Sequence, residues 1–286
     1  MGLFNHQPSD SKVPHLPSSS PSASKADQAT MYPHEKPRDP PSYQPPPITS
    51  SFAGPSRPVA PTYAALHLAK TDRVRLIGFP PDAQRPVNDA ILRAWPVGIQ
   101  QQGPFDASSY EWKLSGRPWS GQGSEAVPAR RLMSHLLHAL SASGWHLAMS
   151  VDLSRKGWDK DTLLFRSGPG LQRYFFSVSF NEGDKVRIID PPNEVTKQAF
   201  IDAISTWPLG IQASKEKEPA CHQLKLRGNP WWTSDGHQIN QSRLLACAIL
   251  SAMDACGFEL VGSVDMSVGT GDNNLDLDSW FFASKI

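Results

Sequence analysis

Trp95-Pro96-Val97-Gly98-Ile99-Gln100 and, shortly after it, Lys113-Leu114-Ser115-Gly116-Arg117-Pro118-Trp119 form a pattern that the chain repeats. The pattern returns 112 residues later as Trp207-Pro208-Leu209-Gly210-Ile211-Gln212 and Lys225-Leu226-Arg227-Gly228-Asn229-Pro230-Trp231. Solenoid repeats are typically about 20 to 50 residues long, so a period of this length indicates a duplicated domain. The chain therefore carries one domain design twice.

Composition and duplication together predict three parts in this chain of 286 residues. Residues 1–57 are rich in Pro and Ser and contain none of the nine tryptophans, so we expect a disordered tail. Residues 58–168 and 169–286 are the two predicted repeats. Each is long enough to bury a core without metal or disulfides.

The order of predicted elements is the same in both repeats. We expect a strand hairpin, a helix that ends before Trp95-Pro96 or Trp207-Pro208, a strand, a longer helix, and two further strands, because a residue that precedes proline is pushed out of the helical region. The expected ranges are 63–68, 74–77, 112–114, 128–143, 145–153 and 162–165 in the first repeat, and 174–180, 186–189, 223–226, 241–256, 258–266 and 279–282 in the second.

This order predicts an α+β fold made of two tandem ββαβαββ units after a disordered N-terminal tail. In each unit the helices lie on one face of a largely antiparallel sheet. Val87, Ile91 and Leu92 are expected to face the first core. Because almost no linker separates the repeats, we expect them to pack together about a pseudo-twofold axis.

The paired motifs Trp-Pro-x-Gly-Ile-Gln and Lys-Leu-x-Gly-x-Pro-Trp resemble those of uncharacterised fungal tandem-repeat proteins. The resemblance covers roughly residues 60–286 and implies no activity, ligand or catalytic residue.

The tail contains Pro40-Pro41-Ser42-Tyr43, which matches the Pro-Pro-x-Tyr pattern that WW domains bind. Prolines preset an extended helix at low entropic cost, and aromatic grooves accept Pro40, Pro41 and Tyr43. The motif predicts a WW-domain partner, for example a ubiquitin ligase. An inert linker is the alternative interpretation, since such a short match arises easily in a proline-rich segment.

The repeated tryptophans have a structural and a functional interpretation. Aromatic side chains beside Pro and Gly anchor turns to a core. In the functional alternative Trp119 and Trp231 form an aromatic ligand pocket, and Trp232, which has no counterpart in the first repeat, is an exposed contact.

A second repeated piece, Ser-Val-Asp, carries Asp152 and Asp265. These carboxylates either face solvent from a half-buried strand or are buried and paired with Arg130 and Arg243. The possible ligand-pocket residues are therefore Trp119, Trp231, Trp232, Asp152, Asp265, Arg130 and Arg243.

Metal and cofactor sites are not predicted. His135 and His138 are three residues apart on a helix, but Ala248 and Ser251 replace them in the second repeat and no third ligand is evident. The acidic loops around Asp159 and Asp276 lack EF-hand spacing. No phosphate-binding loop, dinucleotide fingerprint or nucleophile elbow occurs.

Charge and cysteine content restrict the partner and the compartment. The net charge is +1, from 28 basic and 27 acidic residues, so no nucleic acid is expected. The three cysteines are an odd number and include no Cys-x-x-Cys pair, which favours a reducing, intracellular compartment. We expect the cytoplasm, and the sequence leaves a nuclear location open. Membrane contact is expected only if Gly2 is myristoylated. The N-myristoylation pattern requires Ser or Thr at the position of His6, so the sequence matches it only in part.

We therefore expect a non-enzymatic interaction or adaptor protein, with a tandem α+β body that binds a client and a tail that binds a WW domain. The alternative is an enzyme or small-ligand receptor with a cleft between the two repeats. Polar groups such as Asp152, Arg130 and His135 that converge in a pocket would favour this alternative.

Overall fold

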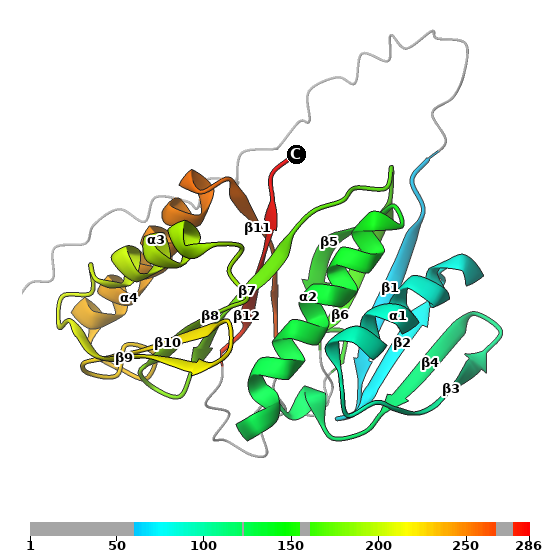
Figure 1. The fold of residues 1–286 in the computed structure, drawn as a ribbon, viewed down its shortest axis with the longest axis horizontal. Coiled ribbons are helices and arrows are strands. Elements are labelled where there is room, and N and C mark those ends of the chain that lie inside the picture. The colour runs from blue at the N-terminus through cyan, green and yellow to red at the C-terminus, as the bar shows by residue number, and fades with distance from the viewer. Residues whose placement is uncertain (1–59, 122, 155–160, 267–276) are drawn as a thin grey trace, which may run out of the picture. The chain divides into compact units, whose positions relative to one another are not determined.

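A computed structural model describes residues 60–121, 123–154, 161–266 and 277–286. Its elements follow the same order twice, as Figure 1 shows. The first repeat contains β1 (Tyr63–Ala69), β2 (Arg73–Ile77), α1 (Gln84–Ala94), β3 (Ile99–Asp106), β4 (Ser109–Leu114), α2 (Ala126–Ala142), β5 (Trp145–Val151) and β6 (Thr162–Ser167). The second contains β7 (Phe175–Asn181), β8 (Lys185–Ile189), α3 (Glu194–Ile204), β9 (Ile211–Glu218), β10 (Cys221–Leu226), α4 (Gly236–Ala255), β11 (Phe258–Val264) and β12 (Ser279–Ser284).

Each repeat forms one six-stranded antiparallel sheet. The strand order is β3-β4-β2-β1-β6-β5 in the first sheet and the equivalent β9-β10-β8-β7-β12-β11 in the second. The predicted α+β class with two tandem repeats is confirmed, although each unit has one more strand than expected. The additional strands, β3 and β9, are mostly exposed edge strands that pair only with β4 and β10, so they lack the apolar alternation that marks a half-buried strand.

The repeated tryptophans close the corners of each repeat. The Trp95 indole N–H donates to the Ser115 carbonyl at 2.8 Å, and Trp207 donates to Arg227 at 2.9 Å. Gly98 (φ 92°) and Gly210 (φ 77°) follow these tryptophans and adopt the left-handed backbone conformation that the turn requires.

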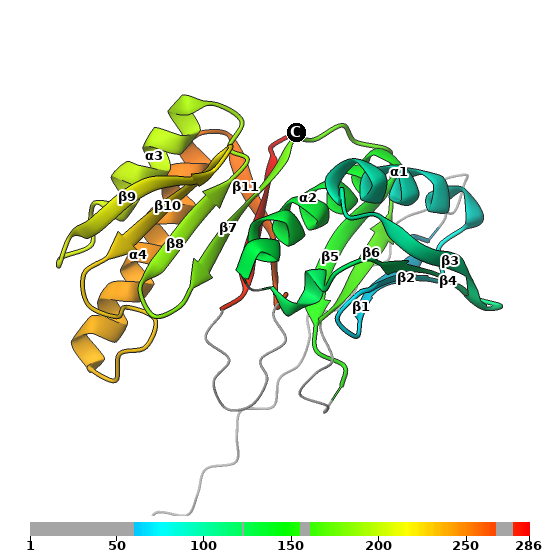
Figure 2. The ribbon, with the colours of Figure 1, turned by 60° about the horizontal axis from the view of Figure 1, so that its bottom comes forward.

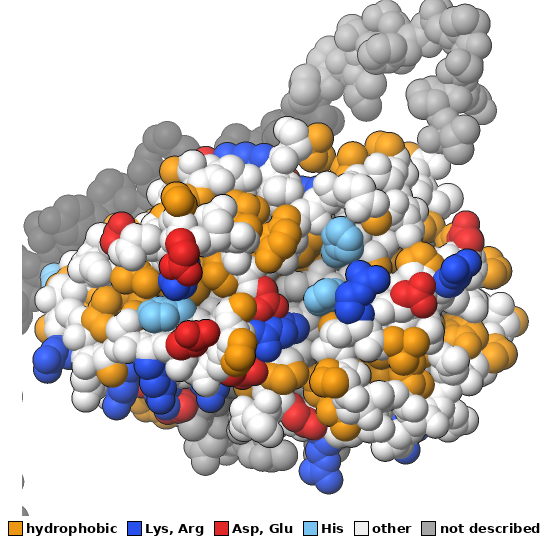
Figure 3. Space-filling view, viewed as in Figure 1, with side chains coloured by type: hydrophobic (Ala, Val, Ile, Leu, Met, Phe, Trp, Pro, Cys, Tyr) orange, Lys and Arg blue, Asp and Glu red, His pale blue; other side chains and the backbone are white. Residues whose placement is uncertain are grey.

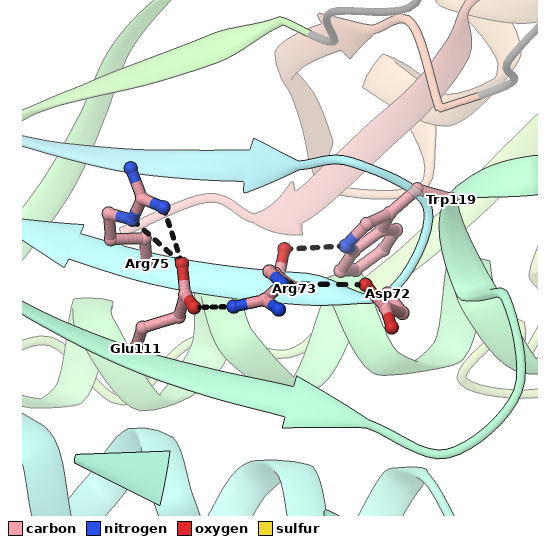
Figure 4. Close-up of polar contacts among 5 residues, drawn as sticks. All are labelled: Asp72, Arg73, Arg75, Glu111 and Trp119. Carbon is pink, nitrogen blue, oxygen red and sulfur yellow. Dashed lines mark hydrogen bonds and ion pairs between the residues drawn. The ribbon is translucent and has the colours of Figure 1, made fainter. Parts of the chain in front are cut away.

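The second tryptophan of each motif ties the corner to the hairpin. Trp119 donates to the Arg73 carbonyl at 2.7 Å (Figure 4), and Trp231 donates to Lys185 at 3.1 Å. The structural interpretation of the motif therefore describes its geometry: large aromatic rings fill the core while their N–H groups bond to backbone carbonyls that would otherwise be unsatisfied.

The two cores are unequal. Eleven of the seventeen residues of α2 are buried, against four of the twenty in α4. The reason is that α2 packs on its own sheet and also on β7 and β8 of the second repeat (Figure 2). Val264, Met266 and Phe281 of the second repeat consequently belong to the core of the first.

Two expectations about packing are wrong. A twofold axis would place α4 on β1 and β2 as α2 lies on β7 and β8, but no comparable contact of α4 occurs in the described part of the chain. Leu92 is 57% exposed because it follows Ile91, which already occupies the core-facing side of α1.

We predict that Trp119→Ala lowers the free energy of unfolding by about 3 to 5 kcal/mol, because it empties a filled core site and removes a buried hydrogen bond. Trp232→Ala is the matched control, since Trp232 is 62% exposed and its loss should change stability by less than about 0.5 kcal/mol. Urea unfolding followed by far-ultraviolet circular dichroism measures both. Equal stability of the two variants would contradict the structural role of Trp119.

Candidate functional site

The contact between the repeats is centred on Arg131 of α2. Its Nε lies 2.9 Å from both carboxylate oxygens of Asp190, and its Nη1 lies 3.3 Å from Glu218 Oε2. Arg131 also donates to the carbonyl of Pro219. One guanidinium on the first repeat therefore binds two loops of the second.

Asp190 occupies a backbone position that favours glycine. Its φ is 54°, and the equivalent residue in the first repeat, Gly78, has φ 73°. Aspartate tolerates the left-handed region better than most residues, at some conformational cost. The second repeat thus places a carboxylate where the first has no side chain, and that carboxylate binds Arg131.

A cavity of about 510 Å³ opens beside this contact. We call it the inter-repeat cleft, and a hollow of about 300 Å³ adjoins it through Arg93, His135, His138 and Gln172. On the face drawn in Figure 3, histidine and basic side chains gather over α1 and α2 beside the neighbouring repeat. The cleft is lined by Arg93, Ser134, His135, His138, Gln172, Arg173, Tyr174, Phe175 and Asp190.

The first repeat supplies the basic side of the cleft. Arg93 is exposed in the last turn of α1, and His135 and His138 lie one turn apart on α2. His138 Nδ1 lies 2.7 Å from the Arg173 carbonyl, which fixes the orientation of its ring. Burial lowers the pKa of His135 below its ordinary value, and the charge of Arg93 lowers it further, so His135 is neutral at pH 7.

The second repeat supplies the aromatic side. The Tyr174 hydroxyl donates to the Asp190 carbonyl at 3.0 Å, and burial, followed by the nearby Asp190 charge, raises the Tyr174 pKa. The Phe175 ring packs edge-on against His138, with 6.4 Å between ring centroids. Arg173 is already engaged, because it donates to the Ser284 carbonyl at 2.7 Å and to Glu259 at 2.6 Å.

The side-chain donors of the cleft that no described residue engages decide what the cleft can bind. Among the described residues, Arg93 and His135 have no hydrogen-bond or ion-pair partner. An anionic group could receive a charge-assisted hydrogen bond from Arg93 and a second from His135, and an apolar portion could pack on Phe175 and Tyr174.

The sequence-predicted aromatic residues lie elsewhere. Trp119 is fully buried in the first core, and Trp231 packs against Phe180 with its indole N–H on a backbone carbonyl. Trp232 is exposed, so the structure does not bring the three tryptophans together in one pocket.

The predicted polar residues are also separated from the cleft. Asp152 is exposed beyond the end of β5, and the Asp265 backbone N–H donates to Asp161 at 2.9 Å. Arg130 is buried and donates to the Ser279 hydroxyl at 3.0 Å, whereas Arg243 is exposed on α4. A ligand pocket between the repeats was expected to bring Asp152, Arg130 and His135 together, and of these only His135 lines the cleft.

Some predicted features cannot be placed. Pro40, Pro41 and Tyr43, together with Asp159 and Asp276, lie outside the described residues. Within the residues that are described, no group of three or more His, Cys, Asp and Glu side chains could hold a metal ion. None of the described helices has the length and apolar character that crossing a bilayer requires.

Sequence reasoning missed Arg93, Tyr174 and Asp190, although one signal, a difference between the two copies, could have found all three. The polar groups of the cleft differ from their counterparts in the other repeat: Arg93 corresponds to Ser205, His135 to Ala248, His138 to Ser251 and Asp190 to Gly78. Positions where the copies differ therefore gather around the cleft. Tyr174 carries the same mark, because its counterpart in the first repeat is Thr62.

We predict that Arg131→Met lowers the free energy of unfolding by about 1 kcal/mol, because it removes hydrogen bonds to carboxylates that are partly exposed. It should also expose Cys221, which is buried against Val127 at the same contact and whose pKa burial raises to about 11. Iodoacetamide labelling read by mass spectrometry should reach Cys221 faster in the variant. The exposed Cys247 is the internal control, and equal labelling of both thiols in the unmutated protein would contradict the buried contact.

The comparisons with known proteins agree with the duplication. One domain-family model matches the chain twice, over residues 62–166 and 174–283, which correspond to the two sheets with their helices. No curated protein and no solved structure matches the chain. The two domain matches together span most of the sequence, and the chain belongs to the family that this domain defines, with the domain present in tandem.

Proposed function

We propose that this protein is a non-enzymatic binding protein whose inter-repeat cleft holds a small anionic ligand with an apolar or aromatic portion. The observation that carries the proposal is the position of the Arg93 guanidinium and the His135 ring, without partners among the described residues, in a cavity that Tyr174 and Phe175 also line. The volume of about 510 Å³ is within the range of small-molecule sites.

The duplication supports a specialised role for this cleft. A residue needed only for the fold of the domain has reason to be present in both copies, as Trp95 and Trp207 are. Arg93, His135 and His138 are present in one copy alone. Their role is therefore local to the place where the repeats meet.

An enzyme that uses the same cleft is the competing hypothesis. His135, with its lowered pKa, could act as a base on a bound substrate. Mass spectrometry of a bound small molecule, before and after incubation with the purified protein, separates the two hypotheses. A binding protein releases its ligand unchanged, whereas an enzyme converts it into a product.

We predict that aryl carboxylates bind the unmutated protein and that their primary amides, which have the same shape without the charge, bind at least about ten-fold more weakly. Arg93→Gln should reduce carboxylate affinity by about ten-fold or more and leave amide affinity unchanged. Isothermal titration calorimetry measures both. Arg227→Gln, at an exposed arginine of the second repeat, is the matched control. Equal binding of acid and amide would refute an anion site.

Carboxylate affinity should also fall as the pH rises. The pKa of His135 is lowered in the empty cleft, and a bound anion favours the protonated ring, so binding takes up a proton between the pKa of the free and the bound state. His135→Gln should abolish this pH dependence. His237→Gln, at an exposed position in the first turn of α4, should preserve it. An unchanged pH profile in His135→Gln would exclude His135 from the site.

The tail supports a second, adaptor role in which Pro40, Pro41 and Tyr43 bind a WW-domain protein, for example a ubiquitin ligase, while the body holds its ligand or client. The observation that favours it is the Pro-Pro-x-Tyr sequence within residues 1–57. A protein of this kind acts inside the cell, and we place it in the cytoplasm of a fungus on the basis of its unpaired cysteines and the resemblance of its repeated motifs.

We predict that isolated WW domains retain the full chain on a column and that Tyr43→Ala abolishes retention, because the tyrosine fills the aromatic groove. Ser42→Ala should bind normally, since the pattern accepts any residue at that position. Equal retention of the Tyr43 and Ser42 variants would argue against the motif.

A further inference from the structure

The inter-repeat cleft continues into the adjoining hollow of about 300 Å³. Four residues line both of them, Arg93 among them, so the two hollows form one connected space. The smaller hollow extends this space along α1, where Arg85 and Asp89 also line it. A ligand in the cleft therefore lies beside charged groups that the cleft itself does not contain.

The charges on this side of α1 alternate in sign. Arg85, Asp89 and Arg93 are spaced four residues apart, so they occupy successive turns on one side of the helix. All three are exposed, and in the described part of the chain no hydrogen bond or ion pair engages their side chains. Figure 3 shows an acidic side chain between two basic ones beside the histidines of the cleft. The wall thus offers one negative group between two positive groups.

Asp89 is the carboxylate of this space that a ligand can use. Among the residues that line the two hollows, the other carboxylate is Asp190. Both of its oxygens lie 2.9 Å from Arg131 Nε, so a ligand ammonium would have to compete with a guanidinium there. At Asp89 the ammonium meets no such competitor among the described residues, and it can form charge-assisted hydrogen bonds.

A ligand that carries only negative charge leaves Asp89 unused. When its carboxylate binds Arg93 and His135, the like charge of Asp89 lies one helical turn from Arg93 and opposes binding. A positive group beside the ligand carboxylate converts this repulsion into an attraction. The arrangement therefore favours a zwitterion over an anion of the same shape.

The aromatic side of the cleft provides a third contact. Tyr174 and Phe175 line the cleft from the second repeat, whereas Asp89 lines the hollow from the first. A ligand that contacts both places an apolar ring on one side of its carboxylate and an ammonium on the other. An aromatic α-amino acid has this shape, because its carboxylate, ammonium and side chain diverge from one carbon atom.

We propose that the ligand of the inter-repeat cleft is a free aromatic α-amino acid. Its carboxylate binds Arg93 and His135, its ammonium binds Asp89, and its ring packs on Tyr174 and Phe175. The inference rests on the proposed function, because it names the class of the anionic ligand assigned above to the same cleft. It adds a role for Asp89, which a site for a simple anion does not require.

Isothermal titration calorimetry at neutral pH with L-phenylalanine and 3-phenylpropionate tests the proposal, because the two compounds differ only in the ammonium group. L-Phenylalanine should bind the unmutated protein about ten-fold or more tightly than 3-phenylpropionate. N-acetyl-L-phenylalanine keeps the carboxylate and the ring but has no positive charge, so it should lose this advantage.

Asp89→Asn separates the ammonium contact from the rest of the site. The variant should bind L-phenylalanine about ten-fold more weakly and should not lose affinity for 3-phenylpropionate. Asp202→Asn, at an exposed aspartate of α3, is the matched control and should bind both compounds as the unmutated protein does. Circular dichroism verifies that both variants, which are altered at exposed positions, keep their fold.

The outcomes distinguish this inference from the proposed function. If 3-phenylpropionate binds as tightly as L-phenylalanine, or if Asp89→Asn keeps the preference for L-phenylalanine, the amino-acid assignment is overturned and the anion site stands. If L-phenylalanine and the aryl carboxylates all fail to bind the unmutated protein, the inference and the proposed function are overturned together.

Discussion

The burial of α2 on two sides is the constraint on which the rest of the structure depends. One side of this helix fills the first core with Leu132, Leu136 and Leu140, as α4 does in the second. The other side lies against the second sheet, where burial requires partners for its polar groups. Arg130, Arg131 and Ser141 find them in Ser279, Asp190 and the Leu171 carbonyl.

The candidate site is a consequence of this arrangement. The polar side of α2 is covered by β7 and β8, and beyond the covered part His135 and His138 line a cavity together with the chain that joins the repeats. Ligand binding in this cavity, as proposed above, would therefore be coupled to the packing of the repeats, because both use the same helix. A ligand that binds groups from both repeats would stabilise their contact by an amount that rises with the logarithm of its concentration relative to Kd.

The two copies differ in how their long helices are covered, and the inter-repeat cleft lies beside the helix that is covered on both sides. Duplication yields two equal domains, yet α2 is covered on both sides and α4 on one. The faces that α2 and the second sheet use internally have counterparts that no described element covers.

The sequence by itself determined the duplicated α+β unit, the elements of each copy and the role of the tryptophan corners. These depend on local signals: alternation, a proline that ends a helix, a glycine that turns the chain, and an exact internal comparison. It did not reveal β3 and β9, whose exposed residues carry no periodic pattern, or the separation of Trp119, Asp152 and Arg243 from any shared pocket. Only the tertiary structure decided which helix is covered twice. The apolar residues of α2 and α4 follow much the same pattern, so the pattern cannot say which of the two helices is covered twice. That depends on contacts between segments about 60 to 150 residues apart, such as Arg131 with Asp190 and Arg130 with Ser279. No local pattern encodes such contacts.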